Sequence, residues 1–304
     1  MNVVVGATGM LGSEICRLLA TQGKAVRALV RGTSNPEALA RLRGLGLEMV
    51  RGDLKDKASL KAACDGATAI ISTASSTLSR QQGDSIDSVD RQGQLNLIDA
   101  AEHAGIGQFV LVSFPPIDID FPLQSAKREV EDRLQRGSMT YTVLQPTCFM
   151  EVWLSPALGF DPAHGTARIY GSGRNKVSWI SFQDVARFAI AALGNDRAAQ
   201  AFIKLGGPDA LSPLEVVQLA QQLTGKAVTV EHVPEDALRA QQSAASEPLQ
   251  QSLAALMLYY AQGDAIDMTN ALRVLGVHRL KSVREYLPGM IQAMSTQPRV
   301  DVRK

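Results

Sequence analysis

Hydrophobic and polar positions in the first half of the chain alternate between short β-branched runs and longer stretches with helical spacing. The short runs are predicted as six strands, at residues 3–5, 25–30, 47–50, 68–72, 108–112 and 141–144. The stretches between them include two clear helices, at about residues 86–104 and 123–134. Strands that alternate with helices form a parallel sheet with helices on both faces. We therefore expect an α/β fold with a doubly wound parallel sheet over about residues 1–150.

The pattern loosens after about residue 150, and residues 151–304 are predicted to form a smaller mixed α/β lobe, with part of the chain returning to the sheet. A hairpin is expected from residues 167–170 and 177–180, joined by the glycine-rich segment 171–175. Three serines, each followed by an acidic residue three positions later, predict helix starts; these are Ser181, Ser212 and Ser282. Residues 241–252, rich in Gln, Ser and Ala, are either a mobile loop or an exposed helical connection.

The first predicted strand is followed directly by three glycines at three-residue spacing, Gly6, Gly9 and Gly12. Between a strand and a helix, the first glycine permits a sharp turn. The second lets the backbone approach a pyrophosphate, and the third lets the helix pack close to the strand. Unpaired amides at the helix start also favour an anion. We expect a dinucleotide to bind at Gly6, Thr8, Gly9, Met10, Leu11 and Gly12; the alternative is an ordinary glycine-rich turn.

The end of the second predicted strand carries Arg31 and no acidic residue. A carboxylate at this place accepts a hydrogen bond from the ribose 2′-hydroxyl of NAD, whereas an arginine suits the 2′-phosphate of NADP. NADP(H) is therefore expected, although a solvated arginine at a strand end is common.

Residues after the third and fourth strands are expected to complete the cofactor site, because a doubly wound sheet holds its ligand at the carboxyl ends of the strands. Asp53, followed by Leu54, is placed to meet the adenine edge or to cap the next turn. Small residues follow the fourth strand at Thr73, Ala74 and Ser75. They could equally form an ordinary loop.

Composition narrows the range of partners. A net charge of +1 and a hydrophobic content of 45% give no reason to expect nucleic acid or a membrane as a partner. The three cysteines (Cys16, Cys64, Cys148) and the four histidines (His103, His164, His232, His278) are scattered. No metal site or disulfide framework is therefore expected. Because residue 2 already begins a strand and no apolar run approaches 20 residues, we expect a cytoplasmic protein without a leader or membrane span.

Taken together, these stretches resemble the atypical short-chain dehydrogenase/reductase superfamily, in its NmrA-like and isoflavone-reductase-like branch. The likeness extends from residue 1 to about residue 190. It rests on residues 6–12, Arg31, residues 52–54, 96–101 and 109–113, Lys127, and residues 145–150 and 184–186. It implies a Rossmann domain that binds NADP, and it places a catalytic serine at Ser113 and a functional lysine at Lys127.

The sequence departs from this superfamily at the position four residues before Lys127. Conventional members carry a proton-donating tyrosine there, and this chain has Leu123. In isoflavone-reductase-like enzymes the lysine is thought to act without it, whereas NmrA-like regulators bind the dinucleotide and need not turn over. Lys127 also falls on the apolar stripe of its predicted helix, with Val130 and Leu134. There it could hold the nicotinamide ribose and move a proton. Alternatively, it could extend into solvent and pair with Glu131.

The sequence is consistent with two functions. The first is an NADPH-dependent reductase of a small apolar carbonyl, enone or quinone, with Ser113 orienting the carbonyl and Lys127 fixing the ribose. The second is a non-catalytic NADP(H)-binding redox sensor or assembly protein that acts on a protein partner. Aromatic and apolar residues either line a substrate pocket or form plain core; they are Phe149, Met150, Trp153, Tyr259 and Tyr260.

Overall fold

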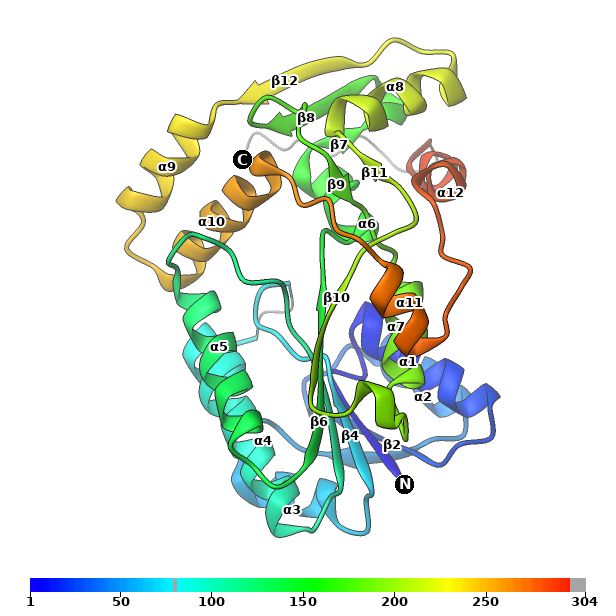
Figure 1. Cartoon of the computed structure of the whole chain (residues 1–304), viewed down its shortest axis with the longest axis vertical. Helices are drawn as coiled ribbons and strands as arrows, with labels where there is room; N and C mark the ends of the chain where they lie inside the picture. The colour runs from blue at the N-terminus through cyan, green and yellow to red at the C-terminus, as the bar shows by residue number, and fades with distance from the viewer. Residues whose placement is uncertain (79–80, 296–304) are drawn as a thin grey trace. The chain divides into compact units, whose positions relative to one another are not determined.

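The structure, a computed structural model, describes residues 1–78 and 81–295, and its main element is a seven-stranded sheet (Figure 1). The strand order is β10-β6-β5-β4-β1-β2-β3. The strands are β1 (Asn2–Val5), β2 (Val26–Val30), β3 (Glu48–Arg51), β4 (Ala69–Ser72), β5 (Gln108–Val112), β6 (Thr140–Pro146) and β10 (Ala201–Leu205). Neighbours from β3 across to β6 pair in parallel, and Val4 in β1 lies between Ala28 of β2 and Ile71 of β4.

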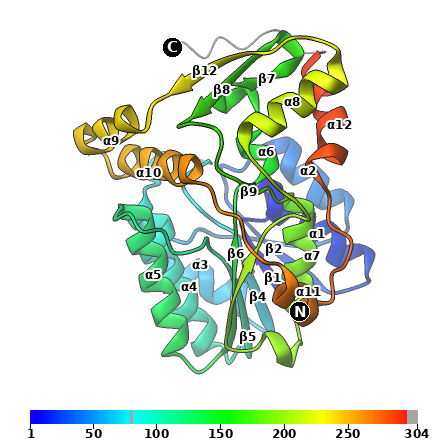
Figure 2. The same cartoon turned by 45° about the horizontal axis from the view of Figure 1, so that its top comes forward.

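Helices cover both faces of this sheet. Figures 1 and 2 show α3, α4 and α5 on one face and α1, α2, α7 and α11 on the other. Their bounds are α1 (Met10–Thr21), α2 (Pro36–Gly44), α3 (Lys57–Cys64), α4 (Gln92–His103), α5 (Pro122–Gln135), α7 (Phe182–Ala191) and α11 (Thr269–Leu275). The doubly wound α/β fold expected from the sequence is confirmed.

The central strands β1, β4 and β5 are mostly apolar and buried, as expected for strands whose two faces are both covered. One cluster joins the strands to the α3–α5 face. It includes Val3, Val5, Ile70, Phe109 and Val143 of the sheet and Leu60, Leu97, Val130 and Leu134 of the helices. This burial on two faces explains why the strands read as continuous β-branched runs in the sequence.

Polar side chains cap the starts of two helices on this sheet. The side chain of Asn35 accepts hydrogen bonds from the first-turn amides of α2, and Asp56 does the same for α3. The long helix expected at residues 86–104 is two segments, a π-helical turn η1 (Ile86–Arg91) followed by α4. A π-turn wedged against a helix often marks a functional position, and η1 carries a buried acid, Asp90, described below.

The chain forms two compact units whose segments alternate along the sequence. The first unit comprises Met1–Gln145, Val185–Ile203 and Ala271–Val277, and it contains most of the main sheet. The second comprises Pro146–Asp184, Lys204–Asn270 and the described residues from His278 onward. Its remaining elements are α6 (Met150–Trp153), β7 (Phe160–Asp161), β8 (Thr166–Tyr170), β9 (Val177–Ser178), β11 (Ala210–Leu211), α8 (Pro213–Thr224), β12 (Thr229–Val233), α9 (Glu235–Ala244), α10 (Pro248–Gln262) and α12 (Val283–Ser295).

The second unit has a small mixed sheet, as expected, but the predicted hairpin is wrong. β8 pairs antiparallel with β7 and parallel with β12, whereas β9 pairs antiparallel with β11. The connection at residues 171–175 contains Gly171 and Gly173, both in the left-handed region with φ of +75° and +70°. Turn-forming residues between two apolar runs suggested a local pairing. β8 instead pairs with β7 just before it and with β12, and β9 pairs with β11; the pairings with β11 and β12 span more than 30 residues, and no local pattern records them.

The segment 241–252, which the sequence left open between a mobile loop and a helical connection, is mostly helical. It comprises the end of α9, residues 245–247, and the start of α10. The mobile-loop alternative is therefore wrong. Glutamine and alanine are good helix formers, which explains why a segment without apolar periodicity still folds into helices.

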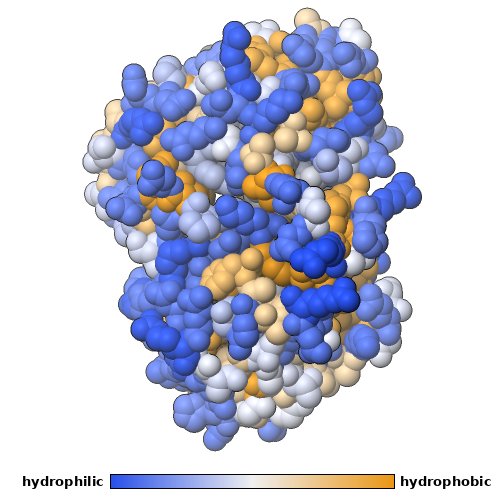
Figure 3. Space-filling view, in the orientation of Figure 1, coloured by the Kyte–Doolittle hydropathy of each residue, from blue (hydrophilic) through white to orange (hydrophobic). Residues whose placement is uncertain are grey.

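Hydrophilic residues cover most of the face shown in Figure 3, with apolar patches between them. Four large apolar side chains are exposed among the described residues, namely Met10, Leu78, Phe202 and Leu223. Within the described ranges, no helix combines the length and the hydrophobicity that crossing a membrane requires.

Candidate functional site

The carboxyl ends of β1 to β4 open into one cleft of about 690 Å³ within the first unit. This volume lies in the range of small-molecule sites, roughly 300–1,000 Å³. The strand order reverses between β1 and β4, so the cleft lies at the switch point where doubly wound sheets bind ligands. Nine of the sequence-predicted residues line it: Gly6, Thr8, Gly9, Arg31, Asp53, Leu54, Thr73, Ala74 and Ser75.

The three glycines differ in what requires them. Gly6 has φ of +84°, and a Cβ there would lie 2.6 Å from Thr73 Oγ1. A Cβ on Gly12 would lie 2.2 Å from the carbonyl oxygen of Gly6. These two glycines therefore allow β1, α1 and the loop after β4 to pack together. A Cβ on Gly9 would have one near neighbour, the Gly6 oxygen at 3.3 Å. The packing of the fold therefore does not require glycine at position 9. Gly9 lines the cleft.

Helix α1 begins at the cleft with its backbone donors available. Its N-cap is Gly9, and among the described residues no side chain accepts a capping hydrogen bond there; the first turn holds no acidic residue. Helix starts leave amides unpaired and carry a partial positive charge, so they favour anions. Met10, Leu11 and Gly12 form this first turn without lining the cleft. Any contribution they make to binding comes from their backbone amides.

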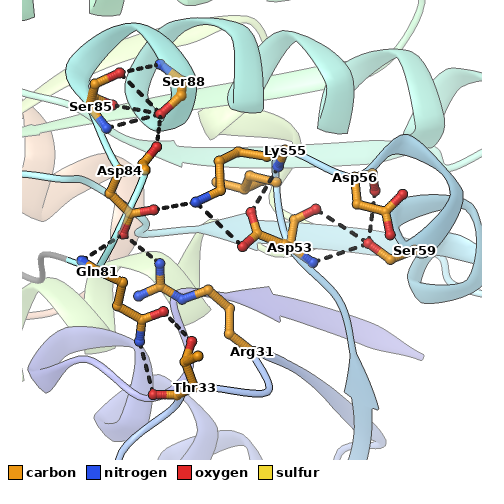
Figure 4. A network of polar contacts seen from close by, with 12 residues as sticks. Arg31, Thr33, Asp53, Lys55, Asp56, Ser59, Gln81, Asp84, Ser85 and Ser88 are labelled. Atoms are coloured by element: carbon orange, nitrogen blue, oxygen red, sulfur yellow. Dashed lines mark hydrogen bonds and ion pairs between the residues drawn. The ribbon is translucent and has the colours of Figure 1, made fainter.

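The guanidinium of Arg31 lies in an ion-pair network at the side of the cleft (Figure 4). Its Nη1 is 2.6 Å from Asp84 Oδ2, and Lys55 Nζ is 2.6 Å from Asp84 Oδ1. The Asp84 side chain is only 1% exposed. Burial acts to raise the pKa of this carboxyl, but hydrogen bonds from Lys55 and Arg31 outweigh burial and hold the pKa below its usual value.

Asp84 is a cleft residue that sequence reasoning missed. A carboxylate that binds the ribose was expected only at the end of β2, which has none. Asp84 reaches Arg31 from 53 residues further along the chain, after β4. It belongs to a polar stretch without periodicity, so nothing local marks it.

Asp53 lines the cleft and also caps the turn that follows it. Its Oδ1 accepts a hydrogen bond from the Lys55 amide at 2.9 Å. The neighbouring Leu54 is buried, and its carbonyl accepts from Asn96 Nδ2 at 3.1 Å. In the loop after β4, the Thr73 hydroxyl donates to the Val5 carbonyl at 3.1 Å. These bonds fix the loops that follow β3 and β4.

Lys127 is buried in α5 and forms an ion pair with Asp90 of η1. The distance from Nζ to Oδ1 is 3.3 Å, and the two side chains are 5% and 0% exposed. The second oxygen of Asp90 accepts from the Ser76 amide at 3.0 Å and from the Ser76 hydroxyl at 2.6 Å. The inward position expected from the apolar stripe is confirmed, and the alternative, a solvent-exposed lysine paired with Glu131, is wrong. Ser76 directly follows Ser75, which lines the cleft.

Glu131 instead pairs with Arg128, at 2.9 Å, beside Ser113. Arg128 Nη2 donates to the Ser113 hydroxyl at 3.3 Å and to the Phe114 carbonyl at 2.7 Å. Burial raises the pKa of Glu131, and this effect is partly offset by the Ser113 hydroxyl, Arg128 and Gln145. Burial also lowers the pKa of Arg128. Ser113 thus lies at the end of β5 within a buried charged cluster, and neither it nor Lys127 lines the cleft.

Two of the aromatic residues proposed for a substrate pocket, Trp153 and Tyr260, pack against each other in the second unit. Trp153 stacks on Tyr260 with ring centroids 4.6 Å apart, and Trp179 meets Tyr260 edge-on at 5.7 Å. Met150 and Tyr260 are buried, and the Tyr259 hydroxyl bonds to Asp264. Elsewhere, the three cysteines are buried and unpaired. The described residues contain no cluster of His, Cys, Asp and Glu that could hold a metal ion.

The sequence of this chain is similar to those of known proteins. The model of the NmrA-like family matches residues 2–287. The chain belongs to the NmrA-like family. A curated relative, photosystem II assembly factor Ycf39 of Synechocystis sp., is 31% identical over 244 residues, which cover 78% of this chain and 72% of that protein. The NAD(P)H azoreductase of Xenophilus azovorans is 30% identical over 230 residues, covering 75% of each chain.

A solved structure shares the fold of this NmrA-like chain. It is an NADPH-dependent quinone oxidoreductase from Escherichia coli in complex with NADPH, with a TM-score of 0.76 and 22% identity. The match covers 95% of this chain and 99% of the other. This likeness shows a shared fold, and the resemblance to the NmrA-like family is confirmed by the family match.

Proposed function

We propose that this NmrA-like protein is an NADPH-dependent reductase of a small apolar carbonyl, enone or quinone. One observation carries the proposal. A single cleft at the switch point of the sheet combines a glycine turn, an uncapped helix start and an arginine at the end of β2. The azoreductase relative, named for its NAD(P)H-dependent reaction, supports a reductase.

The cleft residues fit NADP(H) part by part. The backbone of Gly9 and the first-turn amides of α1 suit the pyrophosphate, and the openness at Gly9 leaves room for it. Arg31 suits the 2′-phosphate, and Asp53 with Leu54 suits the adenine. Thr73, Ala74 and Ser75 suit the remainder of the dinucleotide along the end of β4. When bound, NADPH supplies a hydride.

Lys127 is proposed to hold the ribose hydroxyls nearest the nicotinamide and to move a proton. An ammonium has three donors, and its contact with Asp90 is an ion pair without a hydrogen bond to Asp90 Oδ1, so its donors can serve a ligand. Asp90 is itself fixed by Ser76, next to the cleft residue Ser75. Leu123, one turn before Lys127, is buried and apolar, so proton donation falls to Lys127, directly or through water.

Ser113 is proposed to orient a substrate carbonyl at the end of β5. Its hydroxyl already accepts from Arg128, and it lies beside the carboxyl of Glu131. A hydroxyl that accepts from a guanidinium can present its proton to a carbonyl oxygen once it turns away from the Glu131 carboxyl. Residues 151–304, predicted from the sequence as the smaller lobe, are proposed to contribute the surface for the substrate or a protein partner.

The cofactor assignment is tested by calorimetric titration of NADPH and NADH into wild type and Arg31→Gln. We expect Arg31→Gln to weaken NADPH binding by tenfold or more, because a charge-assisted pair with phosphate contributes at least about 1.4 kcal/mol. NADH binding should change less than twofold. Equal losses for the two nucleotides would remove Arg31 from the 2′-phosphate site.

A second function is an NADP(H)-binding assembly or regulatory protein with a protein partner. Two observations favour it: the likeness to the assembly factor Ycf39, and the leucine at position 123, where a conventional enzyme of this fold has tyrosine. Tight NADPH binding without turnover would distinguish this function from the reductase.

A further inference from the structure

Asp84 pairs with one cation that lines the cleft, Arg31, and with a neighbouring cation, Lys55. Its two carboxylate oxygens are each 2.6 Å from a cation, one from Arg31 and the other from Lys55 (Figure 4). Lys55 also lies 3.7 Å from Asp53. Among the described residues, Arg31 and Lys55 thus pair with Asp84 and Asp53, at the point where the arginine was expected to attract an anion.

The segment that carries Asp84 is held in place by contacts of its own. The Gln81 amide donates to Asp84 Oδ2 at 3.2 Å, and the Gln81 side chain donates to the Thr33 carbonyl at 3.0 Å. The Ser88 hydroxyl donates to the Gly83 carbonyl at 3.0 Å. These contacts hold the Asp84 carboxylate in place as the counter-ion of Arg31 and Lys55.

We propose, on the basis of the NADP(H) site proposed above, that Asp84 sets the choice between NADPH and NADH by competing with the 2′-phosphate for Arg31 and Lys55. A phosphate at Arg31 would face a buried carboxylate of like charge. The phosphate must therefore take over both cations and displace Asp84. A ribose without the phosphate leaves both ion pairs intact. Asp84 thus penalises NADPH selectively, and Lys55 is a second phosphate ligand beside Arg31.

The experiment measures dissociation constants for NADPH and NADH by calorimetry in wild type, Asp84→Asn and Asp87→Asn. Asp87 is a matched control: it lies three residues away, pairs with Arg91 at 2.6 Å, is 67% exposed, and does not line the cleft. We expect Asp84→Asn to bind NADPH about tenfold more tightly, which equals about 1.4 kcal/mol. NADH binding should change less than twofold, and Asp87→Asn should change neither.

A double-mutant cycle tests whether the effect acts through Arg31. In an Arg31→Gln background, the gain of NADPH affinity from Asp84→Asn should shrink severalfold, because one of the two contested cations is gone. Asp84→Ser, a smaller substitution, should shift NADPH affinity in the same direction as Asp84→Asn. It keeps the test open if the asparagine variant does not fold, which its thermal transition reveals.

Other outcomes overturn the proposal in distinct ways. Weaker NADPH binding in Asp84→Asn would mean that Asp84 positions Arg31 and Lys55 for the phosphate. Weaker NADH binding would mean that Asp84 accepts from the ribose hydroxyls. Unchanged affinity for both nucleotides would mean that the ion pairs do not compete with either. If wild type binds neither nucleotide, the proposed function fails before Asp84 is tested.

Discussion

Replacing Gly12 and Gly9 separately should distinguish the glycine that the fold requires from the glycine that the ligand requires. A Cβ on Gly12 would lie 2.2 Å from the Gly6 oxygen, 2.7 Å from the Gly6 carbonyl carbon and 3.0 Å from the Ala7 Cα. All three atoms belong to the backbone of the turn, so relief requires α1 to move away from β1. At Gly9 the Gly6 oxygen, at 3.3 Å, is the one heavy atom within 4 Å.

The expected magnitudes follow from these contacts. Overpacking costs about 1–3 kcal/mol, and the rigid backbone places Gly12→Ala in the upper part of that range, about 2–3 kcal/mol. Alanine in place of glycine within a helix returns about 1 kcal/mol. The net loss is about 1–2 kcal/mol, and at about 2–4 °C per kcal/mol the melting temperature falls by about 2–8 °C. Gly9→Ala should change stability by less than about 1 kcal/mol, because only one contact is tight.

The assay combines thermal unfolding with calorimetric titration of NADPH. Gly9→Val should retain a cooperative transition and lose at least tenfold in NADPH affinity, because its side chain enters the space proposed for the pyrophosphate. Gly44→Ala, at the end of α2, serves as the control, since a Cβ there meets no described residue within 4 Å. It should leave NADPH affinity unchanged and stabilise the fold by at most about 1 kcal/mol. Unchanged NADPH binding in Gly9→Val would refute the reasoning, as would a Gly12→Ala variant as stable as wild type.

Three further predictions concern buried charges and thiols. Lys127→Met should lower the free energy of unfolding in urea by about 3–5 kcal/mol, because it leaves the fully buried Asp90 without its counter-charge. Adding Asp90→Asn should restore most of this loss. If it restores none, the ion pair between the two residues does not stabilise the fold. Because burial raises the pKa of Glu131 above the ordinary 4.5, protonation stabilises the fold as the pH falls from neutrality toward that value. Glu131→Gln should remove this gain, and an identical pH dependence in both proteins would contradict it. Burial raises the pKa of Cys16 to about 12 and of Cys64 to about 11, and also raises that of Cys148. The native protein should therefore resist iodoacetamide at pH 8, and mass spectrometry showing modification before unfolding would contradict this.

Most of the main sheet could be predicted because its strands are buried on two faces. Such strands leave continuous β-branched runs such as Val3 to Val5, and the intervening helices begin at capping residues such as Asn35 and Asp56. The second unit was harder to predict because its strands are short and pair over long separations. β8 pairs with β12, about 60 residues away, and loop composition between β8 and β9 suggested the wrong partner.

The cleft was predictable for the same reason as the sheet. Parallel strands bring their carboxyl ends to one edge, so residues that follow them, such as Arg31, Asp53 and Thr73, were expected together and line one cleft. The inward position of Lys127 followed from helical spacing. Its partner did not, because Asp90 comes from a π-turn that periodicity does not distinguish from an α-helix. Asp84 also escaped prediction, since a polar loop carries no pattern that fixes where its side chains point.

NADPH oxidation in the presence of quinones, enones and aldehydes tests the central claim most directly. Nicotinamide absorbance would be followed for wild type, for Gly9→Val, and for the Lys127→Met/Asp90→Asn pair, after calorimetry has established which of them bind NADPH. If the protein is a reductase, we expect wild type to oxidise NADPH with at least one acceptor and Gly9→Val to oxidise none. The Lys127→Met/Asp90→Asn double variant should turn over more slowly than wild type at saturating NADPH. Tight NADPH binding by wild type without oxidation on any acceptor would contradict a reductase and favour a protein that binds the dinucleotide to act on a partner.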